Sequence, residues 1–268
     1  MSRYYLIILL AVYVTQSFAD ELQLNTGTAK VSTPNRVKFT NLKANGQFYN
    51  AEIEIHLDGN YSLINAEPSA ATPVARYTVT LESTWSENSH PYMYPFGAAH
   101  LSGLIGATHN TTTRFWNRRE LATTGIEIMA ETGGKSALMI EIESAIDAGK
   151  ANQVLSGGGI GSSPGIVEMS IEVDQGFPFI TLVSMIAPSP DWFVGVSGLN
   201  LMKDGNWQNE IRVPLFAYDA GTDGGITYTS ANTDSEPKEA IQRIEQLPFV
   251  IDDEIRPVGV MTFKRDLP

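Results

Sequence analysis

Hydrophobic and polar residues alternate along several short segments, which is the pattern of half-buried β-strands. Residues 166–174 are the clearest case, because every odd-numbered position is apolar and every even-numbered position after Ile166 is polar. The run from Phe179 to Ala187 is almost continuously apolar, as expected for a central strand covered on both faces. Further strands are predicted at 36–40, 48–56, 77–82, 192–196, 210–216, 226–229 and 258–264. Many short strands separated by Gly, Pro and Asn indicate an antiparallel β-sandwich.

Two segments have the 3.6-residue period of helices. The first runs from Thr124 to Glu131, with a threonine N-cap and glycines after its end. The second runs from Ser136 to Ala148 and has one apolar stripe. The fold class is therefore all-β with two short helices. We expect the strands before residue 70 to join the main sandwich.

The first residues have the pattern of a signal peptide. Arg3 is followed by an apolar run, and residues 17–19 form a small-x-small cleavage site. The apolar run is too short to span a bilayer, and no later segment reaches the length of a transmembrane helix. We therefore expect residues 1–19 to be a signal peptide, 20–74 an N-terminal strand-rich extension and 75–265 the main domain. The mature protein would be periplasmic, secreted or extracellular.

Charge and cysteine content narrow the function classes. The net charge is −12, so the chain would meet nucleic-acid phosphates with repulsion and is not expected to bind them. It contains no Cys, which excludes disulfides, thiolate metal sites and cysteine nucleophiles. Because animal matrix proteins usually contain disulfides, we expect a bacterial exported protein.

Three aspartates are the candidate functional residues. Asp191 follows a proline-containing loop, while Asp219 and Asp223 are four residues apart in a glycine-rich turn. Such a turn could aim two carboxylates at one hard cation such as Ca²⁺, and Asp191 could supply a third. Ordinary turn-capping aspartates are an equally good interpretation of the pattern. The spacing is not that of an EF-hand, because Ser230 stands where the bidentate Glu is required.

Two other chemistries compete with this interpretation. His90, His100 and His109 lie close in the sequence, but no zinc-site spacing occurs among them, so structural roles are favoured. A secreted metal-dependent hydrolase that uses the three aspartates is the alternative function. No nucleophile or base is recognisable beside them in the sequence, which favours a protein that is not an enzyme.

Several ordered motifs between Tyr77 and Phe263 resemble the spondin domain of F-spondin and mindin. The most specific are residues 188–195 (PSPDWFVG) and 218–223 (YDAGTD). The other motifs lie at residues 77–81, 85–86, 90–91, 102–110 and 137–143. We therefore interpret the chain as a spondin-domain protein.

The resemblance implies a C2-like β-sandwich that holds one structural Ca²⁺ ion through Asp191, Asp219 and Asp223. It also implies a role in cell adhesion or extracellular recognition. We expect an unidentified surface ligand, such as a glycan, a lipopolysaccharide or another protein. Glu141 and Glu143 lie on the acidic helix that contributes to partner recognition in animal relatives, although a solvated helix face is the simpler interpretation. Met202 stands where animal relatives carry the Cys of a disulfide.

Overall fold

The computed structural model describes residues 28–33, 36–44, 47–55, 61–68 and 74–266. The expected signal peptide at residues 1–19 lies outside these ranges. The chain divides into two compact units, residues 1–73 and 74–268, which are described separately.

The N-terminal unit is a four-stranded antiparallel sheet in the order β1-β2-β3-β4. Its strands are β1 (Thr28–Thr33), β2 (Arg36–Ala44), β3 (Gln47–Ile55) and β4 (Tyr61–Pro68). Each strand pairs with its neighbour in the sequence, which is the pairing with the shortest connections. The expectation that these strands join the main sandwich is therefore wrong, since they form a sheet of their own.

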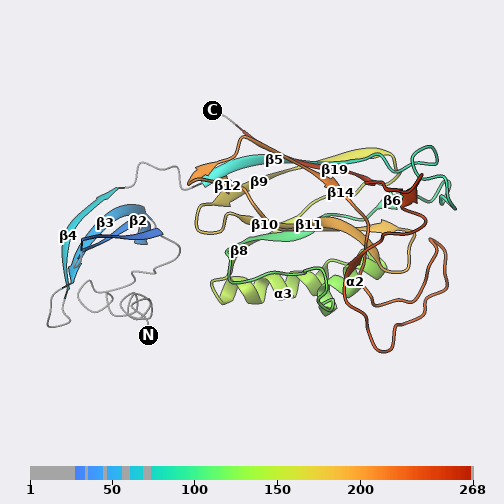
Figure 1. Cartoon of the computed structure of the whole chain (residues 1–268), viewed down its shortest axis with the longest axis horizontal. Coiled ribbons are helices and arrows are strands. Elements are labelled where there is room, and N and C mark those ends of the chain that lie inside the picture. The colour runs from blue at the N-terminus through green and yellow to red at the C-terminus, as the bar shows by residue number, and fades with distance from the viewer. Residues whose placement is uncertain (1–27, 34–35, 45–46, 56–60, 69–73, 267–268) are drawn as a thin grey trace. The chain divides into compact units, whose positions relative to one another are not determined.

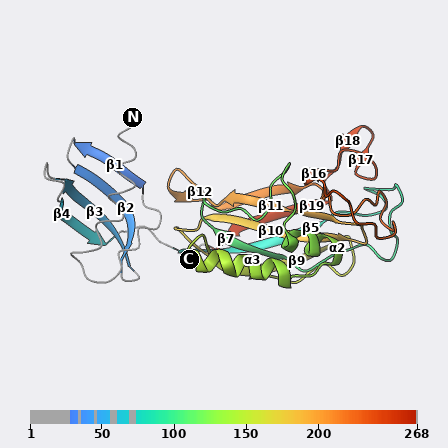
Figure 2. The ribbon, with the colours of Figure 1, turned by 90° about the horizontal axis from the view of Figure 1, so that it is seen from below.

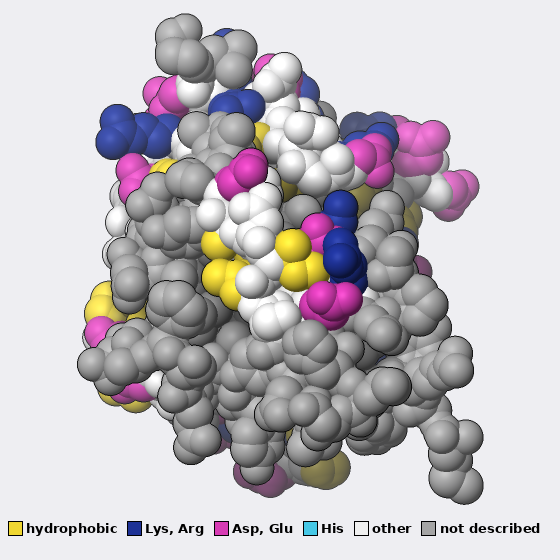
Figure 3. Space-filling view, turned by 90° about the vertical axis from the view of Figure 1, so that its left-hand side faces the viewer, with side chains coloured by type: hydrophobic (Ala, Val, Ile, Leu, Met, Phe, Trp, Pro, Cys, Tyr) yellow, Lys and Arg dark blue, Asp and Glu magenta, His cyan; other side chains and the backbone are white. Residues whose placement is uncertain are grey.

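Cross-strand side chains in this sheet are both apolar and charged. Val37 lies opposite Ile53 and both are buried, while Arg36 pairs with Glu54 at 3.6 Å. Figure 3 shows positive and negative side chains lying beside one another on this face of the molecule. Exposed ion pairs of this kind contribute less than about 1 kcal/mol each, so the apolar row is the stronger contact.

The main unit contains two larger antiparallel sheets and two small hairpins. One sheet has the order β16-β15-β11-β10-β7-β8, with β6 also paired to β10, and the other has the order β14-β19-β5-β9. The first sheet consists of β6 (His100–Leu101), β7 (Ile105–His109), β8 (Ala151–Ser156), β10 (Phe179–Ala187), β11 (Trp192–Asn200), β15 (Tyr218–Asp219) and β16 (Gln242–Arg243). The second consists of β5 (Val74–Ser83), β9 (Gly165–Asp174), β14 (Glu210–Leu215) and β19 (Gly259–Arg265). The hairpins are β12 (Met202–Lys203) with β13 (Asn206–Trp207), and β17 (Val250–Ile251) with β18 (Glu254–Ile255).

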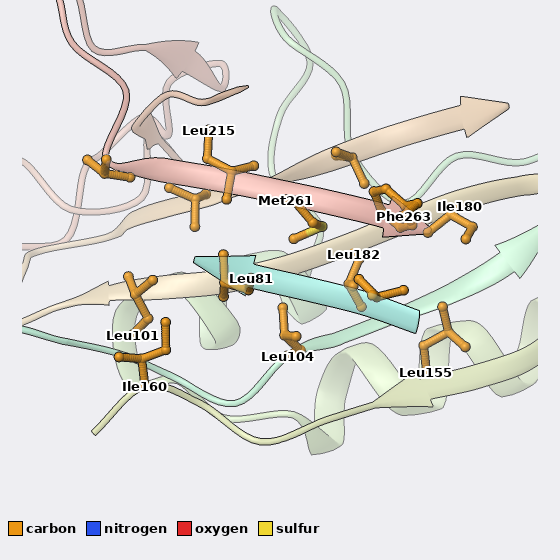
Figure 4. Close-up of a cluster of buried hydrophobic side chains, with 14 of the residues drawn as sticks. Leu81, Leu101, Leu104, Leu155, Ile160, Ile180, Leu182, Leu215, Met261 and Phe263 are labelled. Carbon is orange, nitrogen blue, oxygen red and sulfur yellow. The ribbon is translucent and has the colours of Figure 1, made fainter. Parts of the chain in front are cut away.

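The main unit has three layers. Figures 1 and 2 show the two sheets packed face to face, with helices α2 (Thr124–Thr132) and α3 (Ser136–Asp147) covering the outer face of the β10-containing sheet. Leu81, Leu182 and Phe263 belong to the core between the sheets, as Figure 4 shows. A second core, which includes Ile126 and Val183, lies between the helices and the sheet. No helix in the described ranges is long and apolar enough to cross a membrane.

The predicted fold class is confirmed: antiparallel sheets form a sandwich, and two short helices cover it. Strand β10 is buried along almost its whole length, and β9 alternates between inward apolar and outward polar side chains as predicted. The strand predicted at 226–229 is wrong. Those residues form a turn in which the Thr227 N–H donates to Ser230 Oγ, and Tyr228 is buried while Ile226 is exposed.

A carboxylate from one helix caps the start of the other. Thr123 is the N-cap of α2, and its Oγ1 accepts a hydrogen bond from the Ile126 N–H. The Glu141 side chain, on α3, accepts bonds from the Gly125 N–H and from Thr123 Oγ1, both at 2.7 Å. An anion at a helix N-terminus is favourable, because the first N–H groups have no partner within the helix. Glu141 therefore joins the two helices, whereas Glu143 is exposed.

The two glutamates make a matched pair for a stability test. Glu141→Ala removes two charge-assisted hydrogen bonds and is expected to lower the free energy of unfolding by about 2 kcal/mol. Glu143→Ala changes an exposed side chain on the same helix and is expected to shift it by less than about 0.5 kcal/mol. Urea unfolding of both variants measures the difference. Equal effects of the two substitutions would contradict the capping role.

The three histidines of the main unit have separate structural settings. His109 is buried, with hydrogen bonds to Thr181 Oγ1 and to the Asn110 carbonyl. His90 is also buried and contacts the Phe249 ring, while His100 is exposed. Burial lowers the pKa of both His90 and His109 below the usual value. Each therefore stays neutral in the folded state at pH values where it would be protonated in the unfolded chain.

This difference makes stability depend on pH. A depressed folded-state pKa contributes stability that is present above pH of about 6.5 and lost as the pH falls below it. Replacing His109 with Gln removes packing contacts, so the variant is less stable at pH of about 7.5. It also removes one titrating group, so the gap in unfolding free energy between wild type and H109Q is expected to narrow toward pH of about 5.5. A gap that stays constant or widens would contradict the neutral buried imidazole.

Candidate metal centre

The three predicted aspartates lie at or just beyond the ends of two neighbouring strands of the β10-containing sheet, β11 and β15. Asp191 directly precedes β11, and Asp219 ends β15, where it lies opposite Trp192 in the β11–β15 ladder. The Ala220 N–H also donates to the Asp191 carbonyl at 3.2 Å. Asp223 follows in the next turn and forms an isolated β-bridge with Asp234. The short β11–β15 pairing therefore joins residues about thirty positions apart in the sequence.

One oxygen of Asp191 holds the turn after β15. Its Oδ2 atom accepts hydrogen bonds from the Thr222 N–H at 2.7 Å, the Asp223 N–H at 3.1 Å and the Thr222 hydroxyl at 3.2 Å. The side chain is fully buried. Its other oxygen, Oδ1, is buried and has no hydrogen-bond partner among the described residues. An unpaired buried carboxylate oxygen is costly, and it commonly marks a site for an ion or an ordered water.

The other two aspartates cap their own turns. Asp219 Oδ1 accepts from the Gly221 N–H and Asp223 Oδ1 accepts from the Gly225 N–H, both at 2.7 Å. Asp223 Oδ2 also accepts from the Thr233 N–H at 2.9 Å. The turn requires glycine at 221, where φ is 74° and a Cβ would lie 2.3 Å from the Glu239 carbonyl oxygen. The turn-capping interpretation is thus correct for Asp219 and Asp223, and each carboxylate keeps free lone pairs.

The carboxylates affect one another electrostatically. Burial, reinforced by the neighbouring charge of Asp191, raises the pKa of Asp219 to about 7. Burial also raises the pKa of Asp191, against the effect of its hydrogen bonds from Thr222 and Asp223, and the charge of Asp223 adds to the increase. A cation among these groups would favour their charged forms and offset the repulsion.

The three aspartates offer carboxylate oxygens, which are the ligands that Ca²⁺ prefers, but their side chains are not arranged around one point. Within the described ranges, no group of three or more His, Asp or Glu side chains is arranged to hold one metal ion together. Asp191 Oδ1 nevertheless has no hydrogen-bond partner among the described residues. Every atom that the three aspartate side chains could offer to a metal ion is a hard oxygen. Completing a calcium shell would require the Asp219 and Asp223 side chains to reorient, together with carbonyl or water ligands.

Two further residues belong to this centre, and the sequence analysis did not identify them. Thr222 supplies the hydrogen bonds that orient Asp191, but nothing in its spacing distinguishes it from other turn residues. Glu131, near the end of α2, has a pKa raised by burial and is also influenced by the charge of Asp191. A signal for Glu131 was available, because an acid in the last turn of a helix opposes the helix dipole and no basic residue accompanies it there.

Comparison with known proteins places this unit in a family. The Spondin_N family model matches residues 75–250. Rat Spondin-2 is 35% identical over 177 residues, which cover 65% of this chain and 54% of the relative, and human Spondin-2 is 34% identical over 178 residues with the same coverage. Bovine Spondin-1 is 32% identical over 188 residues, which cover 66% of this chain and 23% of the relative.

The family match lies within the main unit. The family model covers more than half of the 268 residues and includes most of the sandwich, though not β19, together with all three aspartates. The chain spans about half the length of the Spondin-2 relatives and about a quarter of Spondin-1. Because the family match covers about two thirds of its residues, the chain belongs to the Spondin_N family.

Proposed function

We propose that the main unit is an exported, calcium-stabilised recognition module that acts outside the cell or at its surface and is not an enzyme. The observation that carries the calcium part is Asp191 Oδ1, which is buried without a hydrogen-bond partner among the described residues. Family membership supports the extracellular recognition part.

The three aspartates have different tasks in this proposal. Asp191 is oriented by the Thr222 and Asp223 amides, so its Oδ1 atom is fixed before the ion binds. Asp219 and Asp223 add carboxylate oxygens from the turn that Asp191 holds. A bound Ca²⁺ ion supplies positive charge and ties the turn to the β10–β11 corner. The ion is structural, because its proposed ligands close a loop against the sandwich.

We propose only the chemical class of the ligand that the module binds. A glycan, a lipopolysaccharide or another protein at a cell surface would fit a module of this family. The hydrolase alternative gains no support from the matched relatives, whose names describe spondins. Those relatives are animal proteins, and the expectation of a bacterial source remains a prediction.

Calcium is expected to stabilise the protein. At a concentration a hundred times the dissociation constant, a ligand that binds only the folded state raises the free energy of unfolding by about 2.7 kcal/mol. Chemical unfolding in CaCl₂ and in EDTA measures this difference. Identical midpoints in the two conditions would overturn the calcium site.

Two substitutions locate the ion. Asp191→Asn leaves an amide oxygen to accept the bonds from residues 222 and 223, but replaces the second oxygen with an NH₂ group that repels a cation. It is expected to remove most of the calcium response. Asp204→Asn removes an equal charge from an exposed turn between β12 and β13 and is expected to keep the full response. A full response in D191N would place the ion elsewhere.

A further inference from the structure

A surface cavity of about 430 Å³ lies directly beside the proposed metal ligands, and Asp219 forms part of its wall. Arg118 and Arg119 border it on one side, and residues 239–247 border it on another. Its volume lies within the range of small-molecule sites and is far larger than a single inorganic ion needs. The cavity therefore has room for a ring-sized ligand.

Three arginines line this cavity together with three acids, Asp219, Glu239 and Glu245. Two of the arginines form ion pairs with the same carboxylate. Glu245 Oε1 lies 2.6 Å from Arg243 Nη2 and 3.6 Å from Arg118 Nη2. The Arg243 guanidinium also lies over the Phe216 ring, 5.3 Å from its centre. Guanidinium groups that are already ordered lose little entropy when they bind an anion.

Arg119 is the third, and its guanidinium has no carboxylate partner among the described residues. Its backbone is tightly held, because its N–H donates to the Ile241 carbonyl and the Ile241 N–H donates to the Glu120 carbonyl, both at 2.8 Å. Its φ angle is 69°, in a region that residues with a side chain rarely occupy. Such conformations persist where the surrounding structure enforces them, and they gather at ligand-binding sites.

The rest of the wall combines polar and apolar groups. Gln242 and Gln246 are polar residues of this wall, and Ile226 and Leu247 are apolar residues with exposed fractions of 75% and 48%. A sugar ring has hydroxyl groups at its edge and an apolar C–H face, so it matches a wall of this composition. A bare anion would make no use of the apolar residues.

We infer that this cavity binds an acidic saccharide, with its carboxylate held by Arg119 and its ring against Ile226 and Leu247. Arg118 and Arg243 lie at the same wall and are both paired with Glu245, which leaves Arg119 as the arginine without a carboxylate partner among the described residues. The guanidinium of Arg119 can form two parallel hydrogen bonds to a carboxylate, which is the strongest pairing available to either group. The inference rests on the proposed recognition role and names its ligand class. A cation held by Asp219 would further reduce the negative charge of the wall.

Three probes separate the parts of the ligand. Sodium glucuronate has both the ring and the carboxylate, methyl glucoside has the ring alone, and sodium acetate has the carboxylate alone. Each is titrated into the full chain in CaCl₂ and followed by backbone amide NMR. We expect glucuronate to shift the amide signals of residues 239–247 with at least about tenfold higher affinity than either other probe, a difference of about 1.4 kcal/mol.

Arg119→Gln is expected to weaken glucuronate binding at least about tenfold. Arg212→Gln is the matched control, because Arg212 is exposed on β14 and does not border the cavity. Unchanged binding in R119Q, the same loss in R212Q, or acetate binding as tightly as glucuronate would each overturn the inference. The calcium response in unfolding is measured on the same samples. Failure of glucuronate binding with an intact calcium response would refute the saccharide site alone.

Discussion

The buried carboxylate of Asp191 is the contact on which the functional end of the sandwich depends. A buried charge without partners is costly, and here three hydrogen bonds from Thr222 and Asp223 offset that cost. Those bonds tie the turn after β15 to the corner between β10 and β11. Because both donor residues belong to that turn, the Asp191 side chain helps to position Asp223, while the β11–β15 pairing positions Asp219.

Aromatic packing extends this attachment along the chain. Beyond the turn, Tyr228 packs against Trp192 and Trp85, with ring centroids 5.2 and 5.3 Å apart. Phe249 packs against Trp192 at 5.4 Å. The segment from 220 to 249 has little regular secondary structure, so these rings and the Asp191 contact hold it on the sandwich. The same segment forms much of the wall of the arginine-lined cavity, which places the proposed ion and the proposed saccharide in one structural unit.

The sequence predicted those features that depend on local pattern. Alternation identified β9, and continuous apolarity identified β10, because the two faces of a strand are recorded directly in neighbouring residues. The turn at Tyr228 was wrongly predicted as a strand. Its burial comes from contacts with Trp85 and Trp192, which are distant in sequence and which the local pattern does not reveal. The Asp219–Asp223 spacing was visible. The bond from Thr222 to Asp191 spans 31 residues and depends on a two-residue strand pairing that no local pattern reveals.

The central claim is that a calcium ion lies at Asp191 Oδ1 and also binds Asp219 and Asp223. An anomalous difference map from crystals grown in CaCl₂ tests this most directly, because it locates calcium without reference to the protein coordinates. The account predicts one strong peak about 2.3–2.6 Å from Asp191 Oδ1, with oxygens of Asp219 and Asp223 at similar distances. A calcium peak elsewhere, or no peak beside Asp191, would contradict it.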